Sequence, residues 1–257
     1  MPFTFSHPAL VLPLAGFKPR WFSATGLAIG SMAPDLLYFV KMDGSEDFGH
    51  TLAGVFLFDL PISYLLAIAF HQWVRKPLLV HLPAPLDRKY AGYLAFDFGH
   101  TLSANGFVFP LSVLVGAFSH IGWDYFCDPR GWMYHAAPGF LGQYVSVAGF
   151  RLRVYLLIER IGSVAGLLFV GWAAVRAVHP ADGISPASAR SKGVYWLSLL
   201  LSTLVFTGLR FSFDHHTRQL GQVVLILTSA FCYAVGFVAA LYAWLLPPTP
   251  ARRDKQK

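Results

Sequence analysis

Long runs of apolar residues, separated by polar stretches, dominate the pattern along the chain. A helix that spans a bilayer needs about 20 mostly apolar residues, because the hydrocarbon core is about 30 Å thick and each residue rises about 1.5 Å. A shorter apolar run at 4–17 would be a marginal span or a re-entrant helix, which Pro13 would bend. Six runs have the full length: 21–40, 51–74, 105–127, 154–178, 193–211 and 220–246. The pattern predicts an all-α fold, a polytopic membrane helix bundle with about six long spans plus a short N-terminal apolar helix.

The connections between these runs predict a single membrane-embedded domain over residues 1–257. They are polar and rich in Gly, Pro and Asp. The stretch 179–192 is rich in Pro, Ser and Gly, which is typical of a flexible linker. Residues 248–257 are expected to form a basic tail.

Composition supports lipid as the solvent for much of the surface. Hydrophobic residues make up 55% of the chain and charged residues 13%, with a mean hydropathy of +0.52. A soluble domain carries about 25% charged residues. The 7 Trp and 11 Tyr residues suit anchoring at headgroup level. The two cysteines, Cys127 and Cys232, lie in or beside apolar runs and offer no disulfide framework.

The distribution of positive charge predicts the orientation in a cell (cytoplasmic) membrane. Among the loops and tails between the predicted spans, one side carries 13 Lys and Arg residues and the other six. The excess places the C-terminus and the 75–104 loop in the cytoplasm. These basic flanks are expected to contact anionic lipid. Although the net charge is +7, no basic helix or recognition motif accompanies it, so we expect no nucleic-acid partner.

Ionisable groups in or beside the apolar runs are costly and are candidates for function, and five of them stand out: His7, Asp35, His50, His120 and Asp124. His120 and Asp124 are four residues apart in SHIGWD, so on a helix they share one face. Imidazole with carboxylate suits zinc or another divalent metal. The alternative is that Asp124 accepts a hydrogen bond from a buried His120.

The order of the predicted spans brings these residues to one membrane face. Asp35 lies toward the outer end of its run, His50 begins the next one, and His120 and Asp124 end theirs on the same side. His7 joins them if 4–17 crosses the membrane. Taken alone, His50 also fits an interfacial residue at a helix start. Together they predict a metal site near the outer face.

Other polar residues leave alternatives open. Asp59, inside an apolar run, could orient a ligand histidine or pair with a polar group on a neighbouring helix. The hexapeptide DFGHTL occurs at 47–52 and at 97–102, but the second copy, with His100, falls on the cytoplasmic side. The segment DHHTR at 214–218 has a composition typical of metal binding and also fits a solvated loop.

Several motifs resemble those of a bacterial membrane protein family of unknown function: MPFTFSHPA, GSMAPD, GHT before FLFDLP, and GAFSHIGWD, over residues 1–175. Their order also resembles membrane-bound metal-dependent hydrolases and, more distantly, zinc-dependent phospholipase C. The resemblance implies that Asp35, His50, His120 and Asp124 surround one metal, with zinc as the implied ion. It also implies that His7 and a bridging Asp124 form part of a second site.

The region after SHIGWD departs from those enzymes. They continue with further His and acidic ligands, whereas here only Asp128 and His135 are available. Close relatives tend to carry His at the position of Asp128, so a full trinuclear centre is in doubt. We expect Asp128 and His135 as acid/base partners.

The sequence therefore predicts a metal-dependent hydrolase of phosphoester-type substrates, which include lipid-borne ones. The alternative is a non-enzymatic transporter or scaffold whose His/Asp cluster is an ion pathway or a polar contact between helices. Transport sites lie near the bilayer midplane and often use inverted repeats. The cluster is predicted at helix ends and the chain shows no half-to-half symmetry, which favours an interfacial site, whereas Asp59 alone fits a transporter equally well.

Overall fold

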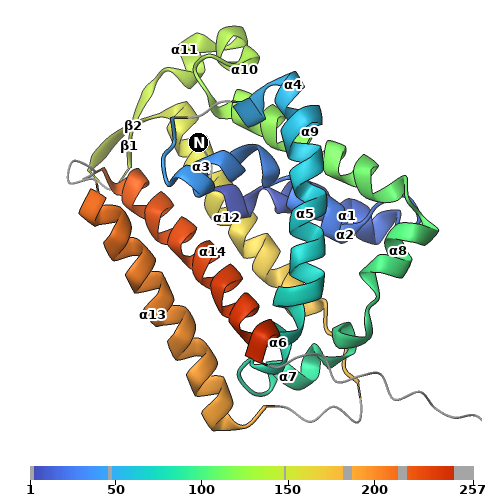
Figure 1. Cartoon of the computed structure of the whole chain (residues 1–257). Coiled ribbons are helices and arrows are strands. Elements are labelled where there is room, and N and C mark those ends of the chain that lie inside the picture. Colours follow the sequence, from blue (N-terminus) through green and yellow to red (C-terminus); the bar gives the residue numbers. More distant parts are fainter. Residues whose placement is uncertain (1–2, 46–47, 148, 182–186, 214–218, 246–257) are drawn as a thin grey trace, which may run out of the picture. The chain divides into compact units, whose positions relative to one another are not determined.

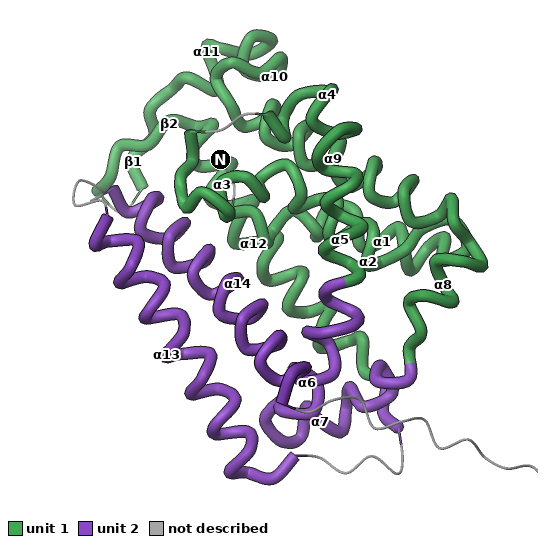
Figure 2. Tube along the Cα trace, in the orientation of Figure 1, with its two compact units in different colours: residues 1–68, 96–178 green, residues 69–95, 179–257 purple. Residues whose placement is uncertain are grey.

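The computed structural model describes residues 3–45, 48–147, 149–181, 187–213 and 219–245, which are mostly helical (Figure 1). The chain divides into two compact units, coloured in Figure 2: residues 1–68 with 96–178, and residues 69–95 with 179–257. The DHHTR segment and the 248–257 tail lie outside the described residues, as does part of the expected linker. The prediction of a single membrane-embedded domain stays a prediction.

The first unit contains the N-terminal helices, the long helix α9 and the helix α12. Its elements are η1 (Thr4–Ser6), α1 (Pro8–Phe17), α2 (Ala24–Gly30), η2 (Ala33–Asp35), α3 (Leu36–Lys41), η3 (Phe48–His50), α4 (Leu52–Gly54), η4 (Val55–Asp59), α5 (Leu60–Ala69, whose end belongs to the second unit), α8 (Phe98–Ala104), α9 (Val108–Cys127), α10 (Trp132–Ala136), α11 (Pro138–Leu141), β1 (Tyr144–Val147), β2 (Phe150–Arg153) and α12 (Val154–Arg176).

The second unit is built on two long helices that pack along each other, α13 (Ala189–Phe213) and α14 (Leu220–Leu245). Its shorter elements are η5 (Phe70–Val74), α6 (Arg75–Val80), α7 (Leu86–Lys89) and η6 (Ala91–Ala95). Tyr195 and Leu199 of α13 pack with Ala234 and Val238 of α14 in its buried core.

Four helical runs among the described residues are long and apolar enough to cross a membrane: Leu52–Val80, Val154–Arg176, Ala189–Phe213 and Leu220–Leu245. They agree with four of the six predicted spans. A fifth is present only if α8 and the run from Val108, bent by 97° relative to each other, form one broken span. The number of about six spans is therefore not confirmed.

The predicted span at 21–40 is broken in the structure. Helix α2 ends at Gly30, the 3-10 turn η2 follows, and α3 runs only from Leu36 to Lys41. Pro34 lies inside the break and has no N–H with which to continue a helical hydrogen-bond ladder. The N-terminal run is also short: α1 has 10 residues and rises about 15 Å, less than a bilayer core. Apolar composition indicated the short N-terminal helix but not the break within 21–40.

The connection before α12 contains a β-hairpin that the all-α prediction missed. Strands β1 and β2 pair antiparallel, with Tyr144 opposite Arg153 and Val147 opposite Phe150. Alternation over four residues is too short to stand out from the surrounding apolar sequence.

Close contact between α2 and α9 positions the polar centre of the first unit. A Cβ atom at Gly30 would lie 2.3 Å from the Val113 carbonyl oxygen, and one at Gly116 would lie 2.6 Å from the Ser31 nitrogen. Only glycine allows the two backbones to approach this closely. The approach brings the end of α2 against the helix that carries His120 and Asp124.

A buried polar network holds the second unit together where α6 and α7 meet α13. The His81 ring stacks on Tyr195, and its Nε2 atom lies 3.0 Å from Ser191 Oγ. The Lys192 ammonium donates a hydrogen bond to the buried Asp87 carboxylate, and this contact lowers the pKa of Asp87. Asp87 therefore favours the folded state in its ionised form.

Replacing Asp87 with asparagine is expected to lower the unfolding free energy by about 1–3 kcal/mol at neutral pH, because Lys192 loses its counter-charge. Because the pKa of Asp87 is lowered on folding, the stabilisation is present above about pH 4 and is lost as pH falls further. In thermal unfolding in detergent from pH 7 to pH 3, the Tm of Asp87→Asn should fall less than the Tm of the wild type. Asp128→Asn, which removes an exposed pair with Arg130, is the control and should change stability by less than about 1 kcal/mol.

Candidate metal centre

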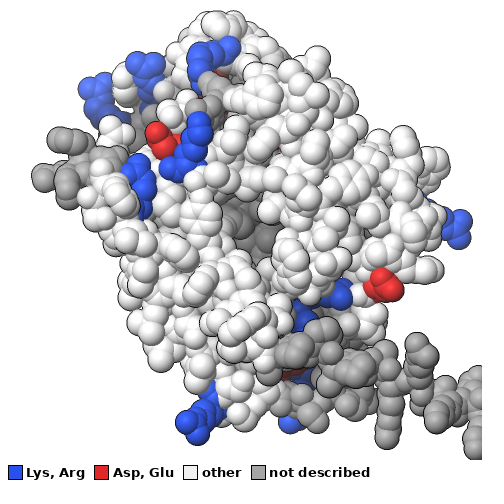
Figure 3. All heavy atoms as spheres, viewed as in Figure 1, with Lys and Arg blue, Asp and Glu red and all other residues white. Residues whose placement is uncertain are grey.

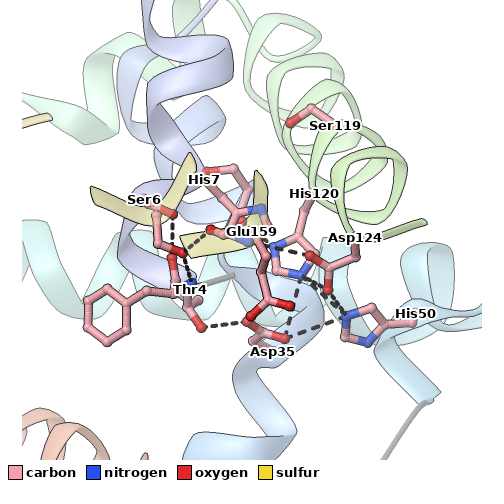
Figure 4. A network of polar contacts seen from close by, with 12 residues as sticks. Thr4, Ser6, His7, Asp35, His50, Ser119, His120, Asp124 and Glu159 are labelled. Atoms are coloured by element: carbon pink, nitrogen blue, oxygen red, sulfur yellow. Dashed lines mark hydrogen bonds and ion pairs between the residues drawn. The ribbon is translucent and has the colours of Figure 1, made fainter. Parts of the chain in front are cut away.

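Asp35, His50, His120 and Asp124 meet in the first unit, each offering one ligand atom, and these atoms all lie within 4.8 Å of one another. Figure 4 shows the four side chains pointing toward a common centre. The two residues on α9 are one turn apart and share its inner face. The short turns η2 and η3 bring the other two to the same point.

The separations between ligand atoms have the size expected around a metal ion. His50 Nε2 and His120 Nε2 are 3.2 Å apart. Each of these nitrogens lies 3.5 Å from Asp35 Oδ1, and they lie 3.5 and 3.6 Å, respectively, from Asp124 Oδ2. Ligands about 2.0–2.2 Å from a tetrahedral zinc ion would be about 3.3–3.6 Å from one another. These five of the six separations are close to those around a small divalent cation, and the sixth, between the two carboxylates, is at most 4.8 Å.

Backbone and side-chain contacts orient these ligands from behind. His120 Nδ1 lies 2.8 Å from the Ser31 carbonyl oxygen, so Nδ1 carries the proton and donates it, which leaves Nε2 facing the centre with a lone pair. The Tyr38 hydroxyl is 3.5 Å from His50 Nδ1, on the far side of that ring. Thr4 Oγ1 donates to Asp35 Oδ2 at 2.5 Å, which leaves Oδ1 toward the histidines.

His7 is a fifth member, stacked on the His120 ring at 3.8 Å between centroids. Its Nε2 atom lies 3.6 Å from Asp124 Oδ1, whereas Oδ2 of the same carboxylate faces His50 and His120. His7 is 1% exposed, and neither ring nitrogen has a hydrogen-bond partner among the described residues. Asp124 thus lies between His7 and the other histidines, in the arrangement expected of a bridging carboxylate.

At the centre, two buried carboxylates face histidine side chains. Among the described residues, no Lys or Arg pairs with Asp35 or Asp124. Burying uncompensated carboxylates is costly, so a cation or shared protons must balance them. The centre is nearly closed: His120 and Asp35 side chains are 0% and 3% exposed, while His50 and Asp124 keep 12% and 11%. Access is therefore along the edge formed by His50 and Asp124.

Other predicted residues lie outside the cluster. Asp128 follows the end of α9 in extended backbone and accepts a hydrogen bond from Arg130 Nε at 3.0 Å, which lowers the pKa of Asp128. His135 lies on α10, and no contact joins it or Asp128 to the cluster among the described residues. His100 is exposed on α8. Neither Asp128 nor His135 belongs to the group of four ligands, and their acid/base role stays a prediction.

Asp59 is fully buried on the π-helical turn η4, but it does not orient a ligand histidine. Neither of its carboxylate oxygens has a hydrogen-bond partner among the described residues. Ser31 and Tyr38 occupy the orienting positions instead. Sequence reasoning missed them and Thr4, although Thr4 and Ser31 lie inside the MPFTFSHPA and GSMAPD motifs. Glu159 of α12, also buried, is drawn beside the cluster in Figure 4.

The long apolar helices and this His/Asp centre define a helical protein of membrane type with a group of residues that could hold a metal ion. The chain belongs to the family described as "domain of unknown function (DUF4184)", whose model matches residues 1–246. The match extends beyond residues 1–175, where the recognisable motifs lie. No curated protein and no solved structure matches the chain.

Proposed function

We propose that this protein is a membrane-embedded, metal-dependent hydrolase of phosphoester-type bonds. Asp35, His50, His120 and Asp124 hold one divalent cation, and zinc is the ion that two imidazoles and two carboxylates suit best. The observation that carries the proposal is the convergence of these four ligand atoms within 4.8 Å.

The distances favour a shared ion over polar contacts between helices. Charge-assisted hydrogen bonds between nitrogen and carboxylate are about 2.7–2.9 Å long. The four histidine–carboxylate separations at the centre are 3.5–3.6 Å. A single proton could join the two histidine nitrogens at 3.2 Å, but it would leave the carboxylates unpaired. A divalent cation would balance both carboxylates at once.

The chain's own residues supply binding and orientation for hydrolysis. A bound divalent cation would lower the pKa of a coordinated water toward neutral and polarise a phosphoryl oxygen. Ser31 and Tyr38 hold the two histidine rings in place, and Thr4 holds Asp35. The partly exposed edge at His50 and Asp124 admits water and substrate. His7 stacks on the His120 ring and lies on the Oδ1 side of Asp124, so its packing helps to preorganise the centre.

The surroundings point to the substrate class and the location. Since the centre lies in a protein with helices able to cross a membrane, a lipid-borne phosphoester can reach it without leaving the bilayer interface. The charge distribution favours a cytoplasmic membrane with the C-terminus inside and the centre toward the outer face. The basic flanks would then contact anionic lipid on the inner side.

Asp59 favours a second candidate function, an ion pathway in a non-enzymatic transporter. Its side chain is 0% exposed within the Leu52–Val80 span, and η4 is a π-helical turn, a feature frequent at functional sites. Such a carboxyl would carry a proton or meet a passing cation. Proton or zinc flux into proteoliposomes that is abolished by Asp59→Asn, with no phosphodiester cleavage, would select this candidate.

The direct test is the metal content of the detergent-purified protein, with a matched pair of histidine variants. The hexapeptide DFGHTL occurs twice, so His50→Ala and His100→Ala make the same change in the same local sequence. We expect about one or two equivalents of zinc or manganese in the wild type and in His100→Ala, but less than about a tenth of that in His50→Ala.

The metal centre is contradicted if the wild type holds no metal after reconstitution with zinc. It is also contradicted if His50→Ala binds as much metal as the wild type. If metal is bound, the loaded protein should cleave phosphodiester or phospholipid substrates. If the protein binds metal but cleaves none of these substrates, the metal centre is supported and the hydrolase proposal is contradicted.

A further inference from the structure

The β1–β2 hairpin precedes a helix able to cross a membrane. Strand β2 ends at Arg153, and α12 begins at Val154 as one of the four candidate spans. Since α12 has 23 residues and rises about 34 Å, slightly more than the hydrocarbon core, its first residues lie near the headgroups. The hairpin joined to it therefore lies at a membrane interface.

The register of the hairpin gives it two different faces. Directly opposed residues in an antiparallel pair point to the same side of the sheet, and neighbours along a strand point to opposite sides. One face is basic and polar and consists of Tyr144, Ser146, Arg151 and Arg153; the other is apolar and consists of Val145, Val147, Phe150 and Leu152. The hairpin is amphipathic in the manner of an interfacial peptide.

The apolar face is largely uncovered within the protein. Phe150 is 71% exposed and Val147 is 41% exposed. A two-stranded hairpin is at best marginally stable in water. The acyl boundary of the bilayer, where the start of α12 places the hairpin, would bury both side chains.

The basic face holds two guanidinium groups in place without neutralising them. Arg151 and Arg153 each lie 5.2 Å from the Tyr144 ring centroid, and Arg153 Nε donates to the Tyr144 hydroxyl at 3.2 Å. No carboxylate pairs with either arginine among the described residues. Figure 3 shows Lys and Arg groups, with an acidic group among them, at the upper left of a view that is otherwise mostly uncharged.

We propose that the β1–β2 hairpin is a docking surface for the phosphate headgroups of anionic phospholipid. Phe150 and Val147 enter the acyl boundary, while Arg151 and Arg153 reach the phosphate layer, where a guanidinium can donate two parallel hydrogen bonds. Charge complementarity and the position at the start of α12 identify this occupant. The surface is separate from the basic flanks that are expected on the cytoplasmic side, and the inference does not depend on a hydrolase activity.

A photoreactive residue at the hairpin tests the occupant directly. Benzoylphenylalanine would replace Phe150 in the full chain, reconstituted in vesicles with equal amounts of phosphatidylglycerol and phosphatidylcholine, and crosslinked lipid would be identified by mass spectrometry. We expect phosphatidylglycerol adducts to exceed phosphatidylcholine adducts by on the order of tenfold, given the attraction of each basic side chain near the surface. The preference should disappear when Arg151→Gln and Arg153→Gln are added.

The matched control removes the same charge elsewhere in the unit. Lys18 and Arg176 also lie over aromatic rings, of Phe17 and Trp172, and Arg176 ends the helix that the hairpin precedes. Lys18→Gln with Arg176→Gln should leave the preference at position 150 within about twofold, because neither residue belongs to the hairpin and Arg176 lies at the far end of α12, beyond a Debye length of about 10 Å. Equal adducts with both lipids, adducts only with another protein chain, or a preference that survives the hairpin double variant would each overturn the proposal.

Discussion

Replacing His120 with alanine is expected to abolish the stabilisation of this protein by divalent metal. His120 is 0% exposed, its Nε2 atom faces both carboxylates, and its Nδ1 proton is donated to Ser31. A metal at about 1,000 times its dissociation constant stabilises the folded state by about 4 kcal/mol. For a chain of this size, that corresponds to a rise in Tm of about 8–16 °C.

The measurement is a thermal unfolding series in detergent with chelator or with added zinc. Wild type should lose about 8–16 °C on chelation, whereas His120→Ala should unfold at one temperature under both conditions. His135→Ala is the control, because this histidine lies outside the cluster and its variant should keep the wild-type response. If the Tm of the wild type changes with neither chelator nor zinc, shared protons rather than a metal ion balance the carboxylates at the centre.

Replacing Gly116 with alanine is expected to disrupt the packing of α2 on α9. The added Cβ would lie 2.6 Å from the Ser31 nitrogen and 2.7 Å from the Leu27 carbonyl oxygen. These are backbone atoms, so relief requires moving one helix against the other, at a cost of about 1–3 kcal/mol or more. The same shift displaces the Ser31 carbonyl that holds His120, so metal occupancy should fall together with stability.

A second glycine on the same helix is the matched control. A Cβ at Gly122 would have nothing within 4 Å, so Gly122→Ala should be neutral or stabilising by up to about 1 kcal/mol through helix propensity. Tm and metal content would be measured for both variants. Equal behaviour of Gly116→Ala and Gly122→Ala would mean that close contact at Gly116 is not what positions the centre.

The sequence by itself determined the helical, membrane-type character of the chain. Four of the predicted runs are helices long and apolar enough to cross a membrane, because twenty apolar residues leave few other structures whose backbone groups are all hydrogen-bonded. The sequence also grouped His7, Asp35, His50, His120 and Asp124. Ionisable residues are rare in apolar runs, and the spacing of His120 and Asp124 places them on one helical face.

Only the tertiary structure decided how those residues are held and which others stay apart. Apolar composition could not show that the predicted span at 21–40 breaks at Ser31 and Pro34, and this break is what turns the Ser31 carbonyl toward His120. Nor could it show that α9 ends at Cys127 and that Asp128 pairs with Arg130 instead. These outcomes depend on where helices end and how closely two backbones approach, which long-range packing sets and local sequence does not.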